Sequence, residues 1–343
     1  MQIIRCDSSH DATWNAFVDA SLHASFYHRA EWRAINERCF RHRTCYLAAT
    51  DGDRMVGIFP LVQLKSVLFG NIACSLPFVN YGGPCGDTEA IEAALLDVAA
   101  QVADEWRVDY LEIRNKRRLS DRYPSSTHKV SLTVDLAPDP ETLFSAFKTD
   151  QRKDIRRGYK YGFTARFGTV DMLDDFYSIL SESWRDLGTP IYSKDYLSTV
   201  ITTFPDSTRI CVVYAADGTP AASAFVGHQT GTVEGMWLGT RAQYRRQLVG
   251  YVLYWELIKD ACLGGHRLFH LGRSTAESGA EQFKKKWNAR PTQLYWQYLL
   301  RTRPEIPQLS VTNKKFHLAM AAWRKLPVTV TQYVGPLIAR SIP

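Results

Sequence analysis

The same order of local patterns occurs twice along the chain. In each half an apolar run leads into an Asp-Gly pair, Asp51-Gly52 or Asp217-Gly218, and a second apolar run follows. Such a pair between apolar runs predicts a β-hairpin, because glycine adopts positive φ without strain. The flanking predictions also match: a helix before each hairpin (26–32 and 176–184), a helix after it (88–106 and 243–263), then a strand (109–114 and 267–271). The repetition predicts two related halves.

The predicted boundary between the halves lies near residue 137. Residues 130–136 alternate as a strand does, and Pro138 and Pro140 then interrupt the pattern. A chain of 343 residues is also too long for one ordinary hydrophobic core. We therefore predict an N-terminal domain at 1–137, a C-terminal domain at 138–302 and a basic tail at 303–343. Each domain should be of the α/β (α+β) class, with a mixed twisted sheet flanked by helices.

Composition limits the classes of function. The seven cysteines are scattered without a C-x-x-C pair, so neither a disulfide framework nor a metal site is expected. No stretch approaches the roughly 18 apolar residues of a transmembrane helix, and the first residues lack the pattern of a secretory signal. A cytoplasmic protein is therefore expected. The net charge of +7 favours an anionic partner, although ordinary enzymes often carry a similar surplus.

A basic stripe follows the boundary. Residues 144–160 are predicted to form one helix, on which Lys148, Arg152, Arg156 and Lys160 recur every fourth residue. Such a stripe can hold phosphate groups through charge-assisted hydrogen bonds, which makes Arg152 and Arg156 candidate substrate-binding residues. The alternative is a solvated helix face without a ligand.

The candidate active site follows the last strand of the second half. The strand at 267–271 leads into Gly272-Arg273-Ser274, and Phe283-Lys284 comes soon after. Lys284 could neutralise the negative charge of a tetrahedral intermediate, with Arg273 and Ser274 lining the cleft. The alternative is an exposed basic helix start, since Lys284 is the first of three consecutive lysines. Four aromatic residues are further candidates for substrate binding, although aromatic residues at these positions more often belong to a core: Phe283, Trp184, Tyr192 and Trp237.

These motifs resemble those of the FemAB/FemX proteins, aminoacyl or peptidyl transferases built from two GNAT-fold domains. The resemblance rests on the duplication, on Phe283-Lys284 and on the Arg152-x-x-x-Arg156 helix, and covers roughly residues 26–300. The segments 76–84, 187–190, 271–274 and 283–287 are similar to those of the FemAB-like branch associated with exosortase (PEP-CTERM) and exopolysaccharide loci. The resemblance implies two tandem GNAT-like domains, with Lys284 as the residue that neutralises charge in the transition state.

The resemblance also implies the kind of donor. GNAT enzymes bind the pyrophosphate of acetyl-CoA on an R/Q-x-x-G-x-G/A turn, whereas the matching stretch 244–251 has a single glycine, Gly250. This favours aminoacyl-tRNA, or another carrier such as an acyl-carrier thioester, over acyl-CoA as the co-substrate, and no further cofactor is expected. The expected acceptor is a lipid- or nucleotide-linked sugar precursor of the cell envelope or of an exopolysaccharide. Two alternatives stay open: an N-acyltransferase that uses CoA or a carrier, and a non-catalytic module of an export assembly.

The tail is predicted to contain a basic amphipathic helix. Phe316, Met320 and Trp323 are spaced at i, i+4 and i+7 between lysine pairs and arginine. This helix either lies on a membrane surface or packs on the body of the protein, and packing is the preferred expectation. Pro336 should prevent a second long helix.

Overall fold

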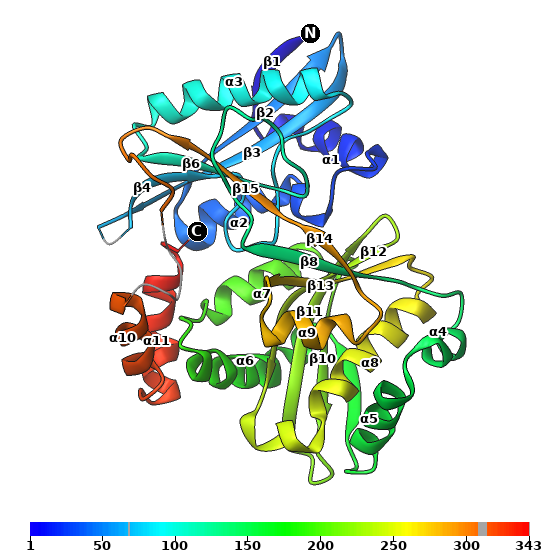
Figure 1. The fold of residues 1–343 in the computed structure, drawn as a ribbon. Helices are drawn as coiled ribbons and strands as arrows, with labels where there is room; N and C mark the ends of the chain where they lie inside the picture. Colours follow the sequence, from blue (N-terminus) through cyan, green and yellow to red (C-terminus); the bar gives the residue numbers. More distant parts are fainter. Residues whose placement is uncertain (68, 308–313, 343) are drawn as a thin grey trace. The chain divides into compact units, whose positions relative to one another are not determined.

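The computed structural model describes residues 1–67, 69–307 and 314–342. The chain forms two compact units, each with one mixed sheet and its own helices (Figure 1). Unit 1 comprises Met1–Val130, Gln293–Gln308 and Arg340–Pro343, and unit 2 comprises Ser131–Thr292 and Leu309–Ala339. The predicted fold class, with one mixed, helix-flanked sheet in each half, is confirmed.

In unit 1 the sheet has the order β1-β2-β3-β4-β6-β15-β7, with β5 paired to β3. Its strands are β1 (Gln2–Cys6), β2 (Arg43–Asp51), β3 (Arg54–Ser66), β4 (Gly70–Cys74), β5 (Cys85–Gly86), β6 (Tyr110–Asn115), β7 (Ser125–Ser126) and β15 (Tyr295–Leu300). Its helices are η1 (Ser8–His10), α1 (Asp11–Ala20), η2 (Phe26–His28), α2 (Glu31–Phe40) and α3 (Glu89–Glu105). Both predicted hairpin strands of this half, β2 and β3, are present and antiparallel.

In unit 2 the sheet has the order β14-β8-β13-β12-β11-β10-β9. Its strands are β8 (Lys129–Asp135), β9 (Thr164–Gly168), β10 (Thr208–Tyr214), β11 (Pro220–Gln229), β12 (Thr232–Thr240), β13 (Leu268–Thr275) and β14 (Arg290–Gln293). Its helices are α4 (Pro140–Ala146), α5 (Thr149–Tyr159), η3 (Val170–Met172), α6 (Leu173–Leu187), α7 (Lys194–Thr203), η4 (Ala242–Gln247), α8 (Val249–Leu263), α9 (Gly279–Lys285), α10 (Lys314–Trp323) and α11 (Val328–Ala339).

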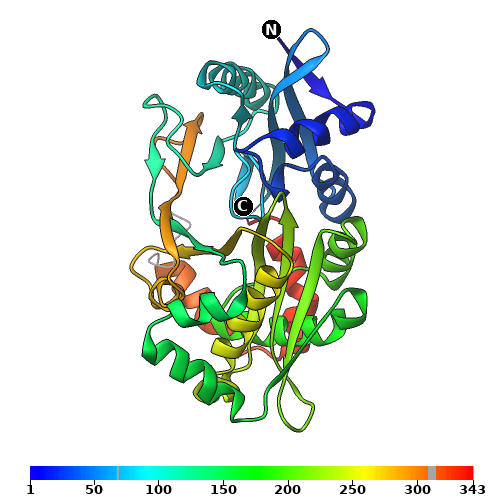
Figure 2. The same cartoon turned by 90° about the vertical axis from the view of Figure 1, so that its right-hand side faces the viewer.

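One strand of each sheet comes from the other half of the sequence. Strand β15 follows the second half but pairs antiparallel with β6 and with β7 in unit 1 (Figure 2). Conversely, β8 ends the first half but lies beside β13 in unit 2. The units therefore divide the chain differently from the predicted domains: residues 293–302 belong to unit 1, and most of the tail belongs to unit 2.

The first sheet is buried on both faces, which explains its nearly continuous apolar strands. Leu47 of β2 packs in a cluster with Leu95 of α3. Its neighbour Tyr46 points to the opposite face and packs with Trp14 of α1. Successive side chains of a strand point to opposite faces, so both must be apolar where helices cover both.

Three local predictions need correction. The single helix at 144–160 is two helices, because Phe147 is extended (ψ 150°) and its buried side chain redirects the chain. The helix at 26–32 is only a 3₁₀ turn, and α2 begins at Glu31. Pro336 lies inside α11 instead of preventing it. Close packing favours α11 there: a Cβ on Gly335 would lie 3.0 Å from the backbone N and O of Ile191.

The predicted tail helix is present as α10 and packs on unit 2. Trp323 is buried, and the Arg324 side chain donates a hydrogen bond to the Leu187 carbonyl at 3.3 Å. Helix α11 contacts α6 and completes this packing. The predicted position of Phe316 lies outside the described side chains. Within the described ranges, no helix combines the length and the apolar character needed to cross a bilayer.

Candidate active site

The candidate site lies where β12 and β13 stop pairing. The two strands run parallel and pair over Thr232–Glu234 and Leu268–His270. Both strands continue beyond these pairs, but β12 has a bulge opposite β11 and β13 turns at Gly272, whose φ is +76°. A Cβ on Gly272 would lie 3.0 Å from the Gly235 carbonyl oxygen. Glycine at 272 therefore provides both the left-handed turn and the space for this opening.

Helix α9 brings Lys284 to this opening. The Ser278 hydroxyl caps the helix by accepting from the Glu281 backbone N–H, and the Glu281 carboxylate accepts from the Glu277 backbone. Three residues after Glu281, the Lys284 ammonium donates to the carbonyls of Gly272 at 3.1 Å and of Arg273 at 3.0 Å. The capped helix thus fixes a cation against the open part of β13.

The Lys284 ammonium is buried without a neutralising anion. Its side chain is 8% exposed, and in the part of the chain that the structure describes no carboxylate forms an ion pair with it. Burial, with a smaller contribution from the neighbouring Arg273 guanidinium, lowers the pKa of Lys284 to about 7. The adjacent Lys285 is instead exposed and pairs with Glu281 at 2.6 Å. Of these two lysines, Lys284 faces the opening.

A row of polar side chains continues from the opening across the sheet. His270 Nδ1 lies 3.0 Å from the Thr133 hydroxyl and 3.4 Å from the Ser131 hydroxyl, both on β8. Glu234 is the strand partner of His270 and is also buried. Ser274 is 6% exposed, and its hydroxyl has no hydrogen-bond partner among the described residues. A buried hydroxyl that lacks a partner is suited to contact a ligand.

His270 and Glu234 are not among the site residues predicted from the sequence. Their proximity depends on the parallel pairing of β12 with β13, which joins residues far apart in the chain. The contribution of Ser131 and Thr133 depends on the exchange of β8 into this sheet. The only sequence signal was the hydroxyl alternation at 131 and 133 within a predicted strand.

The predicted aromatic residues fall into two groups. Trp184 and Tyr192 are half-buried and pack edge-on, with ring centroids 5.5 Å apart, and Tyr192 lies 6.1 Å from buried Trp237. This group lies on α6, β12 and the segment before α7. Phe283 instead packs on α8, with centroids 5.1 Å from Tyr251 and 5.2 Å from Tyr254. Phe283 thereby anchors the helix that carries Lys284.

Arg152 and Arg156 lie on α5, and their described contacts are with the α4–α5 segment. Arg152 donates to the Ser145 carbonyl at 2.9 Å, and the Arg156 guanidinium lies 5.3 Å from the centroid of the Phe144 ring. Among the described residues, no contact joins Arg152 or Arg156 to Lys284. Arg156 remains exposed, as the predicted stripe requires.

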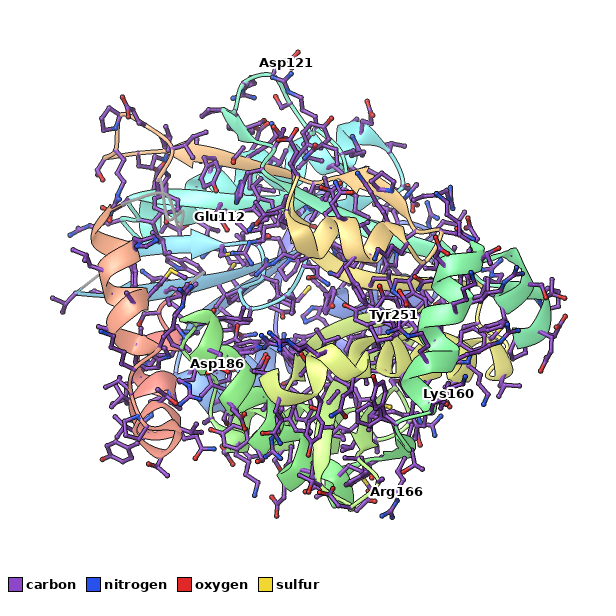
Figure 3. The ribbon with its side chains drawn as sticks, turned by 60° about the horizontal axis from the view of Figure 1, so that its bottom comes forward. Glu112, Asp121, Lys160, Arg166, Asp186 and Tyr251 are labelled. Atoms are coloured by element: carbon purple, nitrogen blue, oxygen red, sulfur yellow. The ribbon has the colours of Figure 1, made fainter. Side chains whose placement is uncertain are left out.

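Helix α5 packs beside α8, so its basic C-terminal end lies near the start of α8. A Cβ on Gly158 would lie 3.3 Å from the Leu248 carbonyl oxygen, so the two helices meet closely. Figure 3 shows Lys160, directly after α5, and Tyr251 of the neighbouring helix α8. Leu248 has a φ of +65° at the N-cap of α8, where no side chain caps the helix. Exposed Arg245 and Arg246 lie just before it, in η4.

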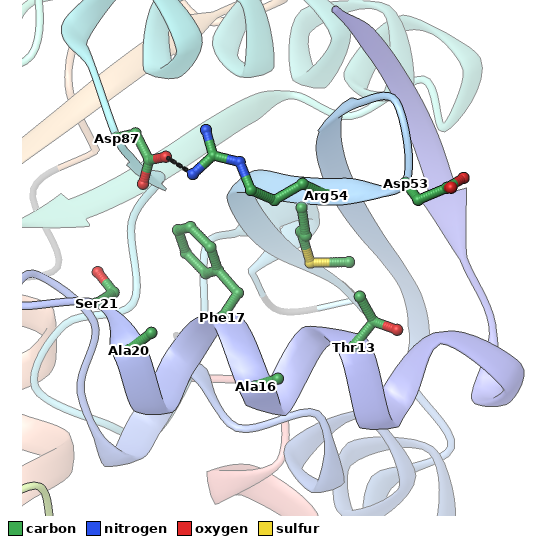
Figure 4. Close-up of a pocket in the computed structure, with 9 residues that line it drawn as sticks. Thr13, Ala16, Phe17, Ala20, Ser21, Asp53, Arg54 and Asp87 are labelled. Atoms are coloured by element: carbon green, nitrogen blue, oxygen red, sulfur yellow. Dashed lines mark ion pairs between the residues drawn. The ribbon is translucent and has the colours of Figure 1, made fainter.

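In unit 1 the corresponding end of β4 and β6 is filled by the chain itself. These strands are parallel over Ile72–Cys74, and the following segment then hydrogen-bonds along β6. The Ser75 N–H donates to the Glu112 carbonyl at 2.9 Å, and the Gly82 N–H donates to the Arg114 carbonyl at 3.3 Å. A hollow of about 390 Å³ lies elsewhere in unit 1, between α1 and the start of β3, where Arg54 pairs with Asp87 at 3.3 Å (Figure 4). Its lining lacks a buried titratable group.

Residues 145–285 match the model of the Acetyltransferase (GNAT) domain family. The fold is a tandem GNAT fold. The whole structure is similar to the crystal structure of FemX, with 12% identity over 89% of this chain and 98% of that chain, at a TM-score of 0.65. It is also similar to L-PGS from Bacillus licheniformis, with 14% identity over 94% and 98% at a TM-score of 0.56.

A third similar structure is a tandem GNAT protein from the clavulanic acid biosynthesis pathway, with 11% identity over 89% of this chain and 99% of that chain at a TM-score of 0.56. A search of curated proteins finds no match to the sequence. At sequence identities this low, the similarity shows the fold alone. The matched GNAT segment contains the whole β12–β13 opening and ends at Lys285, directly after Lys284.

Proposed function

We propose that this tandem GNAT protein is an acyltransferase of the aminoacyl-transfer type, which forms an amide on an amine of a cell-envelope or exopolysaccharide precursor. The observation that carries the proposal is the buried Lys284 ammonium, which two carbonyls hold and which no carboxylate of the described residues neutralises. A fixed cation of this kind stabilises an oxyanion without reorganising during the reaction. The similarity to FemX and L-PGS supports aminoacyl transfer as the form of the reaction.

The reaction is a direct transfer. The acceptor amine nitrogen attacks the carbonyl carbon of the donor ester, and the carbonyl oxygen becomes an oxyanion beside Lys284. As that charge develops, it raises the pKa of Lys284 and favours the protonated ammonium. The intermediate then collapses with cleavage of the ester C–O bond, and the departing alkoxide gains the proton that the amine nitrogen loses. Ser274 is placed to hydrogen-bond the substrate, and Trp184 and Tyr192 are candidates for its apolar contacts.

The donor we favour is aminoacyl-tRNA. The basic residues of α5 and η4 gather at the start of α8, and such a surface suits a polyanion. Leu248 also occupies a left-handed position where the CoA-binding turn of GNAT enzymes favours glycine. One observation favours the alternative, an N-acyltransferase that uses CoA or a carrier thioester: the N-terminus of α8 has no side-chain cap, so its N–H groups suit a pyrophosphate.

Transfer from labelled donors tests the proposal. The purified protein is incubated with aminoacyl-tRNA or acyl-CoA and with amino-sugar or lipid-linked amine acceptors, and labelled amide is quantified. Lys284→Ala should lower the rate by about 10²–10³-fold, as the loss of an oxyanion-stabilising group does. Lys285→Ala is the matched control, because that exposed neighbour should leave the rate nearly unchanged. Full turnover by Lys284→Ala would remove the assigned role.

The donor is distinguished by salt dependence. Arg156→Gln combined with Lys160→Gln should weaken aminoacyl-tRNA binding and flatten its dependence on salt, since each neutralised phosphate contact lowers the slope by about one. The control is Lys194→Gln on α7, an exposed lysine that pairs with Asp174. Transfer from acyl-CoA alone, unaffected by the α5 substitutions, would show the alternative to be correct.

A further inference from the structure

Helix α11 contacts the body of unit 2 through its small residues. Thr331, Gly335 and Ala339 are spaced at i, i+4 and i+8 and are buried. Gly335 lies against Ile191, where a Cβ would come within 3.0 Å of the backbone. Gln332 adds a hydrogen bond of 3.0 Å to the Ser181 hydroxyl on α6. The contact face is therefore closely packed, and the large side chains of α11 lie outside it.

Val330, Tyr333 and Leu337 are exposed, so the best-packed face of α11 carries small residues and large apolar side chains face outward, the inverse of the usual surface helix. Tyr333 is 80% exposed and Leu337 is 63% exposed, and Val330 precedes them on the same face at i, i+3 and i+7. On α10, Leu318 is 73% exposed. Helix α11 contains no charged residue at all, yet at 12 residues it is too short to span a bilayer. An exposed apolar face of this kind indicates a binding surface.

The charged side chains of the segment that carries this face all have one sign. After Glu305 the sequence contains no acidic residue, whereas it contains Lys314, Lys315, Arg324, Lys325 and Arg340. Arg324 and Lys325 are exposed in the connection between α10 and α11. On neighbouring α6, the carboxylate of Asp186 is paired with Arg185 at 2.7 Å and so leaves the basic character intact.

We propose that the exposed face of α10 and α11 binds an anionic lipid surface. Leu318, Tyr333 and Leu337 enter the interfacial region, where tyrosine is favoured because its ring is apolar and its hydroxyl reaches water. Arg324 and Lys325 contact lipid phosphates. The charge pattern argues against a second copy of the chain, because pairing two such faces would bring the cations of both together. The proposal does not depend on the transferase activity.

Vesicle co-sedimentation with the full chain tests this surface. The wild type should bind phosphatidylcholine vesicles that contain phosphatidylglycerol and bind pure phosphatidylcholine far less. Arg324→Gln with Lys325→Gln should lower partitioning to the anionic vesicles by about tenfold or more, given the contribution of each cation. Leu318→Ser, Tyr333→Ser and Leu337→Ser together should abolish measurable binding. Leu263→Ser is the matched control, since Leu263 is equally exposed at the end of α8.

Two results would overturn the proposal. The first is wild-type binding that is absent, or equal for neutral and anionic vesicles. The second is unchanged binding by the triple serine variant. Circular dichroism melts accompany each variant. The melt of the triple serine variant should match the wild type because its substituted side chains are exposed, and the melt of the Arg324→Gln, Lys325→Gln variant measures the loss of the Arg324 hydrogen bond to the Leu187 carbonyl. A concentration-dependent dimer that the triple variant loses, without any vesicle binding, would assign the face to a second copy instead.

Discussion

Replacing Lys284 by methionine should make the protein more stable while removing its activity. Methionine is of similar length, so the core should accept it with little repacking. Lys284 has a pKa of 10.5 when unfolded and about 7 when folded. Above pH 10.5 the amine is neutral in both states and costs nothing. As the pH falls, the unfolded chain takes up the proton first, so stability declines until the cost is complete below pH 7.

The magnitude follows from the two pKa values and the two hydrogen bonds. The difference between them corresponds to about 5 kcal/mol in favour of unfolding at pH 6. Methionine removes this cost but leaves the carbonyls of Gly272 and Arg273 without their donor, which costs about 1–3 kcal/mol. Lys284→Met should therefore gain about 2–4 kcal/mol at pH 6. At pH 9 the gain should be smaller by about 3 kcal/mol, because most of the charge cost has already disappeared.

Urea unfolding at pH 6 and pH 9 measures both values, with Lys285→Met as the control for a neighbouring exposed lysine. The control should change the free energy of unfolding little, since its ion pair with Glu281 is at the surface. Equal or lower stability of Lys284→Met at pH 6 would refute the reasoning. It would mean that the folded protein already compensates the Lys284 charge, and that the ammonium is not held ready for an oxyanion.

Two further substitutions test the sheets. Gly272→Ala should destabilise by about 1–3 kcal/mol, because alanine is strained at a φ of +76° and its Cβ would meet the Gly235 carbonyl; chemical denaturation measures this. Arg114→Ala should cost about 3–5 kcal/mol by leaving the buried Glu112 carboxylate unpaired, whereas Arg114→Met with Glu112→Gln should cost clearly less. Equal losses of stability for Arg114→Ala and for the double variant Arg114→Met, Glu112→Gln would contradict the second prediction.

The elements that depend on local chemistry were predictable from the sequence. The Asp-Gly turns, the long apolar helices and the strand at 130–136 follow from short-range preferences, and the structure contains them, except that the helix predicted at 243–263 begins only at Val249, after the 3₁₀ segment η4 and the left-handed Leu248. The break after α4 was not predictable by periodicity, because Phe147 leaves the helix and is buried against Trp255 of α8 and Trp287, which follows α9. The burial of Phe147 in the tertiary structure therefore sets the end of α4, although the residue spacing favours one continuous helix.

The candidate site was predictable only in part. The position of Lys284 after a strand-ending loop suggested a role. The sequence does not show, however, which of the three consecutive lysines is buried. The packing of α9 through Phe283 determines that Lys284 is the buried lysine. The polar partners of His270 were hidden for another reason: β8 is separated from β13 by more than a hundred residues and reaches it by the exchange of strands between the halves. Such pairing has no local signature.

The equivalent positions of the two sheets explain why only one of them should react. Strand pairing aligns Glu112 with His270, so Arg114 in unit 1 corresponds to Gly272 in unit 2. Arg114 fills its own space from the strand and is neutralised by Glu112 at 2.7 Å. Glycine leaves that space empty, and the Lys284 ammonium reaches it from α9, 3.7 Å from where a Cβ would stand. By this register a cation stands at or beside the corresponding strand position of each sheet: Arg114 itself in unit 1 and the Lys284 ammonium next to Gly272 in unit 2. Of these two cations, only the Lys284 ammonium lacks a paired carboxylate among the described residues, so it gains more by meeting an anion, and this difference supports the proposal that the chemistry belongs to unit 2.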